Sequence, residues 1–391
     1  MNAIESNEQA AIDFTDYAHT GPGTIAGRYM RMFWHPVYIA EELAAGRPVP
    51  IKVMSEDLTL YRGKSGKPYI CQARCPHRGA LFSIARVEDD NIRCSYHGWM
   101  FSGTGECVQA PAERPTFCES IRIRQYPTQE YIGLIFVWMG DGDPPPLPRY
   151  PRFEGPGVLD VMTYLRMCNY FNNVDNNVDP AHTPFTHAVS NYTNFGLEGI
   201  PEVHGRENEW GIVQYGKRPD GGVRVSYHGQ PTMLNIKFQP ADLESGWREL
   251  LAWRVPIDDT RHIGYMVNYV DVVGEKADRY REKMAERKAL RAAAEPAHIL
   301  AEKVLRAEIR IDDTYDHPDY FEIQDHVAQM SQGVIADRTN EHLGRSDVLV
   351  TLLRRIWTRE MKAMAAGQPM KQWIYETTME PTTGSEPVPM D

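Results

Sequence analysis

Two short segments, Cys-Pro-His-Arg-Gly at residues 75–79 and Cys-Ser-Tyr-His-Gly-Trp at residues 94–99, constrain the fold more than any other feature. Each segment holds one cysteine and one histidine, and sixteen residues separate His77 from Cys94. The glycines Gly79 and Gly98 allow tight loops whose backbone N–H groups can approach a sulfur atom. Two thiolates and two imidazoles on two loops therefore predict a metal centre with mixed sulfur and nitrogen ligands.

Mixed ligation of this kind is typical of a Rieske [2Fe–2S] centre, in which two histidines replace two cysteines on one iron. The sequence offers Cys75 and Cys94 for one iron, and His77 and His97 for the other. Tyr96 and Trp99 could shield such a cluster from water. A zinc site could use the same four side chains, although zinc fingers pair cysteine with cysteine and histidine with histidine locally. A chance set of buried cysteines and histidines is the third interpretation.

The sequence around these segments predicts a small all-β module between residues 32 and 138. Short β-branched and aromatic runs alternate there with glycine, proline and polar turns, and residues 58–73 read as a hairpin around Gly63–Gly66. Residues 140–157 are rich in proline and glycine, which cannot continue a helix or a central strand, so they are the best domain boundary.

The second half of the chain predicts a sheet and several helices. Residues 172–187 suggest helix and loop, and alternating runs between residues 210 and 273 suggest an antiparallel sheet. Residues 275–310 are rich in helix-forming and charged residues, with a break at Pro296, and a last helix is expected over 347–364.

Composition excludes several classes of protein. The chain has 391 residues and a formal net charge of −11, which argues against a nucleic-acid partner. Its N-terminus does not read as a signal peptide, and no run approaches 18 apolar residues. Six cysteines are too sparse for a disulfide scaffold, so we expect a reducing cytoplasm. The four cysteines outside the two segments are expected to be ordinary core or surface residues: Cys71, Cys107, Cys118 and Cys168.

A second group of candidate ligands lies in Asn-Asn-Val-Asp-Pro-Ala-His-Thr-Pro-Phe-Thr-His, residues 176–187. Two histidines and one carboxylate on one face of a metal leave positions open, which is how non-heme Fe(II) activates dioxygen. Taken alone, His182 and His187 are a weak signal, because a histidine on such a segment is more often a satisfied core or surface residue. A cluster that delivers electrons needs an acceptor, and this favours the metal interpretation.

Taken together, C-P-H-R-G, C-x-Y-H-G-W and N-x-x-D-x-x-H-x4-H resemble the motifs of the Rieske non-heme iron oxygenases. The text at 324–344 is similar to the phthalate dioxygenase-like branch, which also holds aromatic O-demethylases. The resemblance implies an α+β chain, with an N-terminal all-β Rieske domain before a helix-grip catalytic domain, an antiparallel sheet wrapped round a helix. We therefore expect a lead-in at 1–30, the Rieske domain at 31–145 and the mononuclear iron domain at 146–391.

The resemblance also implies roles for single residues. His182 and His187 would be iron ligands, and Asp179 would link the iron site to a Rieske histidine of a neighbouring subunit, His97. Asn176 would lie beside the iron site. The third ligand would be Asp325, which is 138 residues after His187 and whose flanking sequence resembles the family's ligand helix. Three other carboxylates in this region are alternatives: Glu322, Asp337 and Glu341. The neighbouring His326 is not expected to be a ligand, because adjacent helix residues diverge by about 100°.

The activity implied is that of a terminal oxygenase component, with an aromatic substrate, a Rieske cluster and mononuclear Fe(II). The chain contains no G-x-G-x-x-G that opens a βαβ unit, so a flavin and iron–sulfur reductase, or a ferredoxin with a reductase, is expected as electron donor. Family members form trimers or stacked hexamers. Ring dihydroxylation is favoured, oxidative O-demethylation is the alternative, and a Rieske electron carrier without oxygenase activity is the alternative of another class.

The substrate pocket should be apolar with few polar groups. Four cationic residues of the predicted strands could bind a substrate carboxylate: Arg224, Lys237, Arg248 and Arg254. The alternative for each is an ion pair on the solvent face of the sheet.

Overall fold

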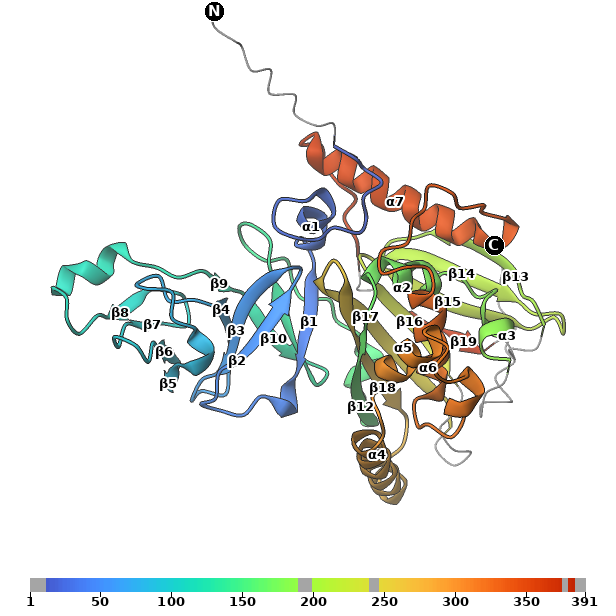
Figure 1. Cartoon of the computed structure of the whole chain (residues 1–391), viewed down its shortest axis with the longest axis horizontal. Coiled ribbons are helices and arrows are strands. Elements are labelled where there is room, and N and C mark those ends of the chain that lie inside the picture. The colour runs from blue at the N-terminus through green and yellow to red at the C-terminus, as the bar shows by residue number, and fades with distance from the viewer. Residues whose placement is uncertain (1–11, 189–198, 239–245, 375–378, 384–391) are drawn as a thin grey trace, which may run out of the picture.

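The computed structural model describes residues 12–188, 199–238, 246–374 and 379–383. It has two lobes along its long axis (Figure 1). Three small sheets form the N-terminal lobe, and an eight-stranded sheet with most of the helices forms the C-terminal lobe. The expected α+β class is confirmed. The domain boundaries after residues 30 and 145 stay predictions.

The N-terminal lobe consists of short antiparallel strands. Its sheets run in the orders β1-β11-β10, β2-β3-β4-β9 and β5-β6-β7-β8. The strands are β1 (Trp34–Ile39), β2 (Val49–Val53), β3 (Glu56–Arg62), β4 (Pro68–Gln72), β5 (Arg86–Glu88), β6 (Asn91–Arg93), β7 (Met100–Phe101), β8 (Cys107–Gln109), β9 (Gln125–Tyr126), β10 (Thr128–Tyr131) and β11 (Leu134–Trp138). The sheet β5–β8 lies at the end of this lobe that is farthest from the C-terminal lobe (Figure 1).

The predicted hairpin joins β3 to β4. Gly63 N–H donates to the Lys67 carbonyl oxygen at 3.0 Å, and Gly66 N–H donates to the Gly63 carbonyl oxygen at 3.1 Å. Gly66 has φ of +85°, a conformation that costs glycine little because it has no Cβ.

The C-terminal lobe contains one large sheet, in the order β12-β18-β17-β16-β15-β14-β13, with β19 paired to β15. The strands are β12 (Val158–Arg166), β13 (Glu202–Glu207), β14 (Gly211–Lys217), β15 (Val223–Gly229), β16 (Met233–Phe238), β17 (Arg248–Asp258), β18 (Arg261–Val270) and β19 (Thr382–Thr383). Strands β14–β18 occupy the predicted strand region. Strands β12 and β13 lie outside it.

Seven α-helices are present in the described part of the chain: α1 (Ile25–Met30), α2 (Tyr170–Asn177), α3 (Thr183–Thr186), α4 (Glu275–Ala293), α5 (Ala297–Leu305), α6 (Tyr320–Met330) and α7 (Val348–Ala365). Pro296 caps α5 and separates it from α4, at the predicted break. Helix α7 packs against β13 and α1 and buries Trp357 completely. None of the helices in the described ranges is long and apolar enough to cross a membrane.

Helices α2 and α6 bring the second group of candidate ligands to the large sheet. Helix α2 packs against β17 and β18, and α6 packs against α5, α2 and α3. Figure 1 shows these helices together over one face of the sheet. A helix held against a large antiparallel sheet agrees with the expected helix-grip arrangement.

Candidate functional site: two groups of metal-ligand side chains

The two Cys-His loops of the N-terminal lobe have the same backbone geometry. In each loop the cysteine N–H donates to the carbonyl oxygen five residues later, at 2.8 Å, and a glycine N–H donates back to the cysteine carbonyl at 3.0 Å. The cysteines are Cys75 and Cys94, and the glycines are Gly79 and Gly98. The glycines have φ of +74° and +76°, which explains why glycine occurs at this point of both loops.

The side chains of these loops converge. The rings of His77 and His97 lie 4.5 Å apart, and Trp99 stacks on His77 at 4.4 Å with nearly parallel planes. Cys75 and Cys94 are buried, and burial raises the pKa of the Cys75 thiol to about 11. His77 Nδ1 is buried without a hydrogen-bond partner among the described residues. Two buried thiols beside two imidazoles fit the donor set of a Rieske cluster.

The expected shielding by Tyr96 is wrong in part. Its ring leans on His97 at 3.8 Å but is 56% exposed, whereas Trp99 is 5% exposed. The histidine side of these loops therefore faces the protein surface, and Trp99 covers His77 from within.

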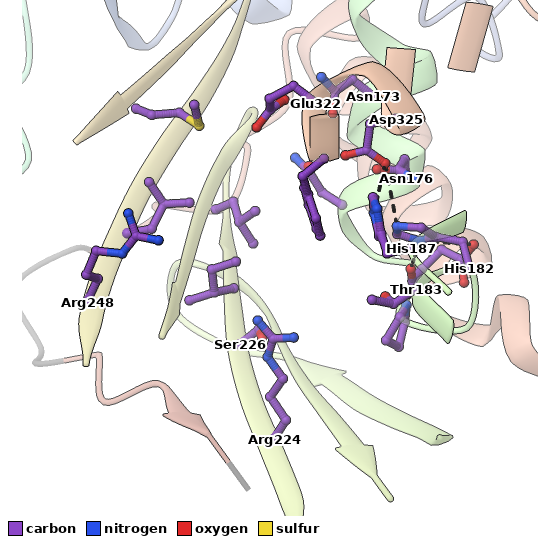
Figure 2. A pocket seen from close by; sticks show the side chains of 18 of the residues that line it. Asn173, Asn176, His182, Thr183, His187, Arg224, Ser226, Arg248, Glu322 and Asp325 are labelled. Carbon is purple, nitrogen blue, oxygen red and sulfur yellow. Dashed lines mark hydrogen bonds and ion pairs between the residues drawn. The ribbon is translucent and has the colours of Figure 1, made fainter. Parts of the chain in front are cut away.

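The second group of ligand candidates surrounds α3. His182 is the N-cap of this one-turn helix and His187 is its C-cap, while Asp325 lies on α6. The candidate ligand atoms of the three residues all lie within 4.8 Å of one another. Asp325 Oδ1 is 3.4 Å from His187 Nε2 and 3.8 Å from His182 Nε2 (Figure 2). The structure thus brings together the three residues that the sequence predicted as iron ligands.

This triad fits a divalent metal ion. His187 Nε2 and Asp325 Oδ1 are buried, and neither has a hydrogen-bond partner in the described part of the chain. Burial disfavours an ionised Asp325, but His187, the nearby Arg166 and His182 outweigh it and hold its pKa well below the usual range. An ionised carboxylate with two imidazoles on one side of a point is the facial triad of non-heme Fe(II) sites.

Neighbouring side chains orient the triad. Gln324 Oε1 accepts a hydrogen bond from His187 Nδ1 at 2.9 Å, and Phe321 stacks on the His187 ring at 3.6 Å. His182 Nδ1 donates to the Asp179 backbone carbonyl, so Nε2 of both histidines faces the metal position. Sequence reasoning missed Gln324 and Phe321. In the sequence, these two residues stand out only because they lie within about one helical turn of Asp325.

The Asp179 carboxylate lies beside the triad. Its Oδ1 accepts the Ala181 N–H at 2.9 Å, and its Oδ2 is 3.7 Å from His182 Nδ1. Asp179 and Asn176 both line the cavity that the triad faces. The predicted link from Asp179 to His97 would involve a second chain and stays a prediction.

The alternative carboxylates have other partners. Glu322 Oε2 is 3.3 Å from the fully buried Arg166, Glu341 pairs with Arg354, and Asp337 caps its own turn through Thr339. All three are absent from the group of ligand atoms that includes Asp325.

His326 also points away from the triad. Both of its ring nitrogens lie within hydrogen-bond distance of backbone carbonyls, those of Glu322 at 2.6 Å and Leu165 at 2.7 Å. This agrees with the expectation that it is not a ligand.

A cavity of about 240 Å³ extends from the triad toward the large sheet. Its apolar wall includes Leu234, Ile236, Leu250 and Met266, which pack together on β16, β17 and β18. The expectation of few polar groups is wrong, because six arginines of the described residues line the cavity: Arg218, Arg224, Arg248, Arg254, Arg287 and Arg291.

Acidic or amide groups contact several of these arginines. Arg287 pairs with Asp160 at 2.6 Å, Arg291 pairs with Asp319, and Arg218 pairs with Asp220 at 3.0 Å. Arg254 donates to Asn177 Oδ1 at 3.1 Å. Arg224 and Arg248 extend from strands on the side of the cavity opposite the triad (Figure 2).

We expect Gln324→Leu to weaken ferrous iron binding by about tenfold to a hundredfold, since loss of an outer hydrogen bond to a ligating histidine has effects of this size. Competition with a coloured chelator measures the affinity. Gln329→Leu is the matched control: it changes another buried glutamine of α6, whose side-chain amide has no hydrogen-bond partner in the described ranges. Equal affinities for the two variants would show that Gln324 does not orient His187.

The comparisons with known proteins agree with the Rieske interpretation of the N-terminal lobe. Residues 33–127 match the family model described as the Rieske [2Fe-2S] domain. The oxygenase subunit of 5,5'-dehydrodivanillate O-demethylase from a Sphingobium strain is 29% identical over 92% of this chain and 82% of its own. The alpha subunit of phenoxybenzoate dioxygenase from Ectopseudomonas oleovorans is 28% identical over 88% of this chain and 84% of its own.

Solved structures share the fold. The NdmA protein of Pseudomonas putida CBB5, solved with caffeine, superposes with a TM-score of 0.66 over 92% of this chain and 98% of its own, at 19% identity. The oxygenase of carbazole 1,9a-dioxygenase was solved in complex with a ferredoxin. It superposes with a TM-score of 0.62 over 91% of this chain and 95% of its own chain, at 20% identity.

The Rieske domain and these oxygenase relatives, which match 88% to 92% of this chain, support a Rieske-type oxygenase. The relatives are subunits of oxygenase systems, and the chain resembles the subunit that carries out the oxidation in such a system.

Proposed function

We propose that Cys75, His77, Cys94 and His97 hold the Rieske cluster, and that the triad His182, His187 and Asp325 holds a mononuclear Fe(II). The convergence of the three triad side chains at the end of a cavity is the observation that carries this proposal. The cluster would supply single electrons, and the mononuclear iron would supply dioxygen activation next to the substrate. Asp325 contributes the negative charge, and Gln324 and Asp179 fix the two imidazoles.

Electrons would pass between subunits. In one chain the sheet β5–β8, which adjoins the cluster loops, and α3 lie in opposite lobes (Figure 1). A trimer or stacked hexamer could bring His97 of one subunit to Asp179 of the next. The Asp179 carboxylate would then accept an N–H from His97 while its own backbone carbonyl holds His182, which gives a short bonded path.

The electron donor is proposed to be a separate protein, either an iron–sulfur flavin reductase or a ferredoxin with a reductase. The carbazole 1,9a-dioxygenase oxygenase, which shares the fold, was solved in complex with a ferredoxin. The exposed Tyr96 beside His97 would allow a donor protein to approach the histidine side of the cluster.

The substrate is proposed to be an aromatic carboxylate. The apolar wall can take a ring, and Arg224 and Arg248 add positive charge opposite the triad. Burial, reinforced by Arg218, lowers the pKa of Arg224 to about 10. A carboxylate held at these strands would direct the far side of the ring toward the iron.

We expect Arg224→Met to raise KM for a carboxylated aromatic by about tenfold to a hundredfold, because hydrogen bonds to charged groups are lost. KM for the corresponding methyl ester should change little. Arg218→Met is the matched control, since this arginine lines the same cavity but pairs with Asp220. If Arg224→Met raised KM equally for acid and ester, the carboxylate anchor would be refuted.

Ring dihydroxylation is the favoured reaction, and oxidative O-demethylation is the second candidate because one relative that matches 92% of this chain is an O-demethylase subunit. A single-turnover assay separates them. The reduced protein is mixed with phthalates, benzoates or methoxybenzoates, exposed to oxygen, and its products are analysed by mass spectrometry. A cis-diol identifies dihydroxylation, and a phenol with formaldehyde identifies demethylation. The absence of any product, together with only two irons per chain, would favour the electron-carrier alternative.

A further inference from the structure

Two cysteines outside the ligand group face each other in the N-terminal lobe. Cys107 begins β8, and Cys118 lies in the short 3-10 helix η3 (Pro115–Ser120). Their Sγ atoms are 2.9 Å apart and both are free thiols. Sulfur atoms this close can be joined by a small side-chain movement, without rearrangement of the strands. Sequence reasoning did not pair these two cysteines, which lie eleven positions apart.

The pair lies in the wall behind the cluster loops. Cys107 belongs to the same buried apolar group as Cys75 and Cys94, and Cys118 packs against that group. Phe117, next to Cys118, contacts Trp99 edge to face at 5.1 Å, and Trp99 stacks on His77. A change at this pair would therefore act on the packing that supports a cluster ligand.

The two thiols do not read as a metal site. The group of closely spaced ligand atoms found among the described residues is the iron triad, and this pair is not part of it. The thiols also differ in access to solvent. Cys118 is partly exposed, whereas Cys107 is 8% exposed. Cys118 is thus the thiol that a dissolved oxidant can reach.

We infer that Cys107 and Cys118 form a reversible, peroxide-sensitive thiol pair beside the Rieske cluster. The Cys118 thiolate attacks hydrogen peroxide, the O–O bond breaks, and Cys118 becomes a sulfenic acid as hydroxide leaves. The Cys107 sulfur then attacks the Cys118 sulfur, its proton passes to the departing hydroxide, and a disulfide forms. Overall, two thiols and one peroxide give one disulfide and two waters. The disulfide ties η3 to β8 and holds Phe117 against Trp99.

Peptide mapping of the intact, cluster-loaded protein tests this inference. The protein is treated with hydrogen peroxide while the visible absorption of the cluster is followed, then alkylated and cleaved after glutamate. The cleavage gives Cys107–Glu113 and Arg114–Glu119 as separate peptides with one cysteine each. We expect one linked peptide, lost again on treatment with a dithiol. Two separately alkylated peptides, or a link that forms only after the cluster absorption has gone, would overturn the inference.

Single variants test the order of attack. In Cys107→Ser, dimedone should label Cys118 as a trapped sulfenic acid; in Cys118→Ser, Cys107 should remain an unlabelled thiol. Cys168→Ser is the control, because it removes a buried cysteine of the other lobe and should leave the link intact. Retained cluster absorption shows that each variant is folded. Labelling of Cys107 in Cys118→Ser, or none of Cys118 in Cys107→Ser, would contradict the proposed roles.

Discussion

Asp325→Ala should remove the mononuclear iron and leave the Rieske cluster in place. Asp325 offers the triad its only carboxylate, and both histidines face its Oδ1. Two neutral imidazoles alone bind Fe(II) weakly, and product formation should fall by about a thousandfold or more because the reacting metal is lost. Electron paramagnetic resonance of the reduced protein with nitric oxide detects the ferrous site, and visible absorption detects the cluster.

Asp337→Asn is the control for this experiment, because Asp337 is an exposed carboxylate that caps its own turn. It should retain both the ferrous signal and the activity. A ferrous signal of full strength in Asp325→Ala would mean that another carboxylate completes the site. Glu322 would then be the first to examine, since it lies on the same helix and lines the same cavity.

Asp179→Asn should keep both metal centres but slow electron transfer from the cluster to the iron by about tenfold to a hundredfold, the usual range for outer-ligand substitutions. The amide keeps the size of the side chain but loses the charge and one acceptor that the proposed link to His97 requires. Stopped-flow reoxidation of the reduced cluster in the presence of substrate and oxygen measures the transfer. An unchanged rate would remove the bridging role of Asp179.

Mixed oligomers show whether the transfer crosses between subunits. Cys75→Ser chains lack a cluster but keep Asp179 and the triad, and Asp179→Asn chains keep the cluster. If electrons cross to the next subunit, the cluster of an Asp179→Asn chain can serve the intact iron site of a Cys75→Ser neighbour. Mixed oligomers should then be more active than either variant alone. If transfer stays within one chain, the mixture should be no more active than its parts.

The ligand candidates were predictable from sequence because metal binding imposes residue type and local spacing together. The pairs on the two loops and the His182–His187 pair each lie within one short segment, so the chain itself brings them close. Asp325 is 138 residues from His187, and only its resemblance to a family motif distinguished it from Glu322. The structure separates the two by their partners, since Glu322 faces Arg166.

Other features depend on contacts that no local pattern records. Strand β12 was missed because Asp160 interrupts its run of apolar residues. In the fold this buried carboxylate pairs with Arg287 and accepts a hydrogen bond from the Tyr280 hydroxyl. Strand β13 has little apolar alternation, and its pairing with β14 and the cover of α7 define it. The arginines of the cavity come from strands and helices far apart in sequence, so their convergence is visible only in the folded chain.

The central claim is that one chain holds a Rieske cluster and a second, mononuclear iron in the triad of His182, His187 and Asp325. Mössbauer spectroscopy of protein loaded with ferrous iron without oxygen tests it most directly, with the chain concentration determined independently. The account predicts two cluster irons and one mononuclear ferrous iron per chain, and loss of only the latter in Asp325→Ala. Spectra in which all bound iron belongs to the cluster would contradict it.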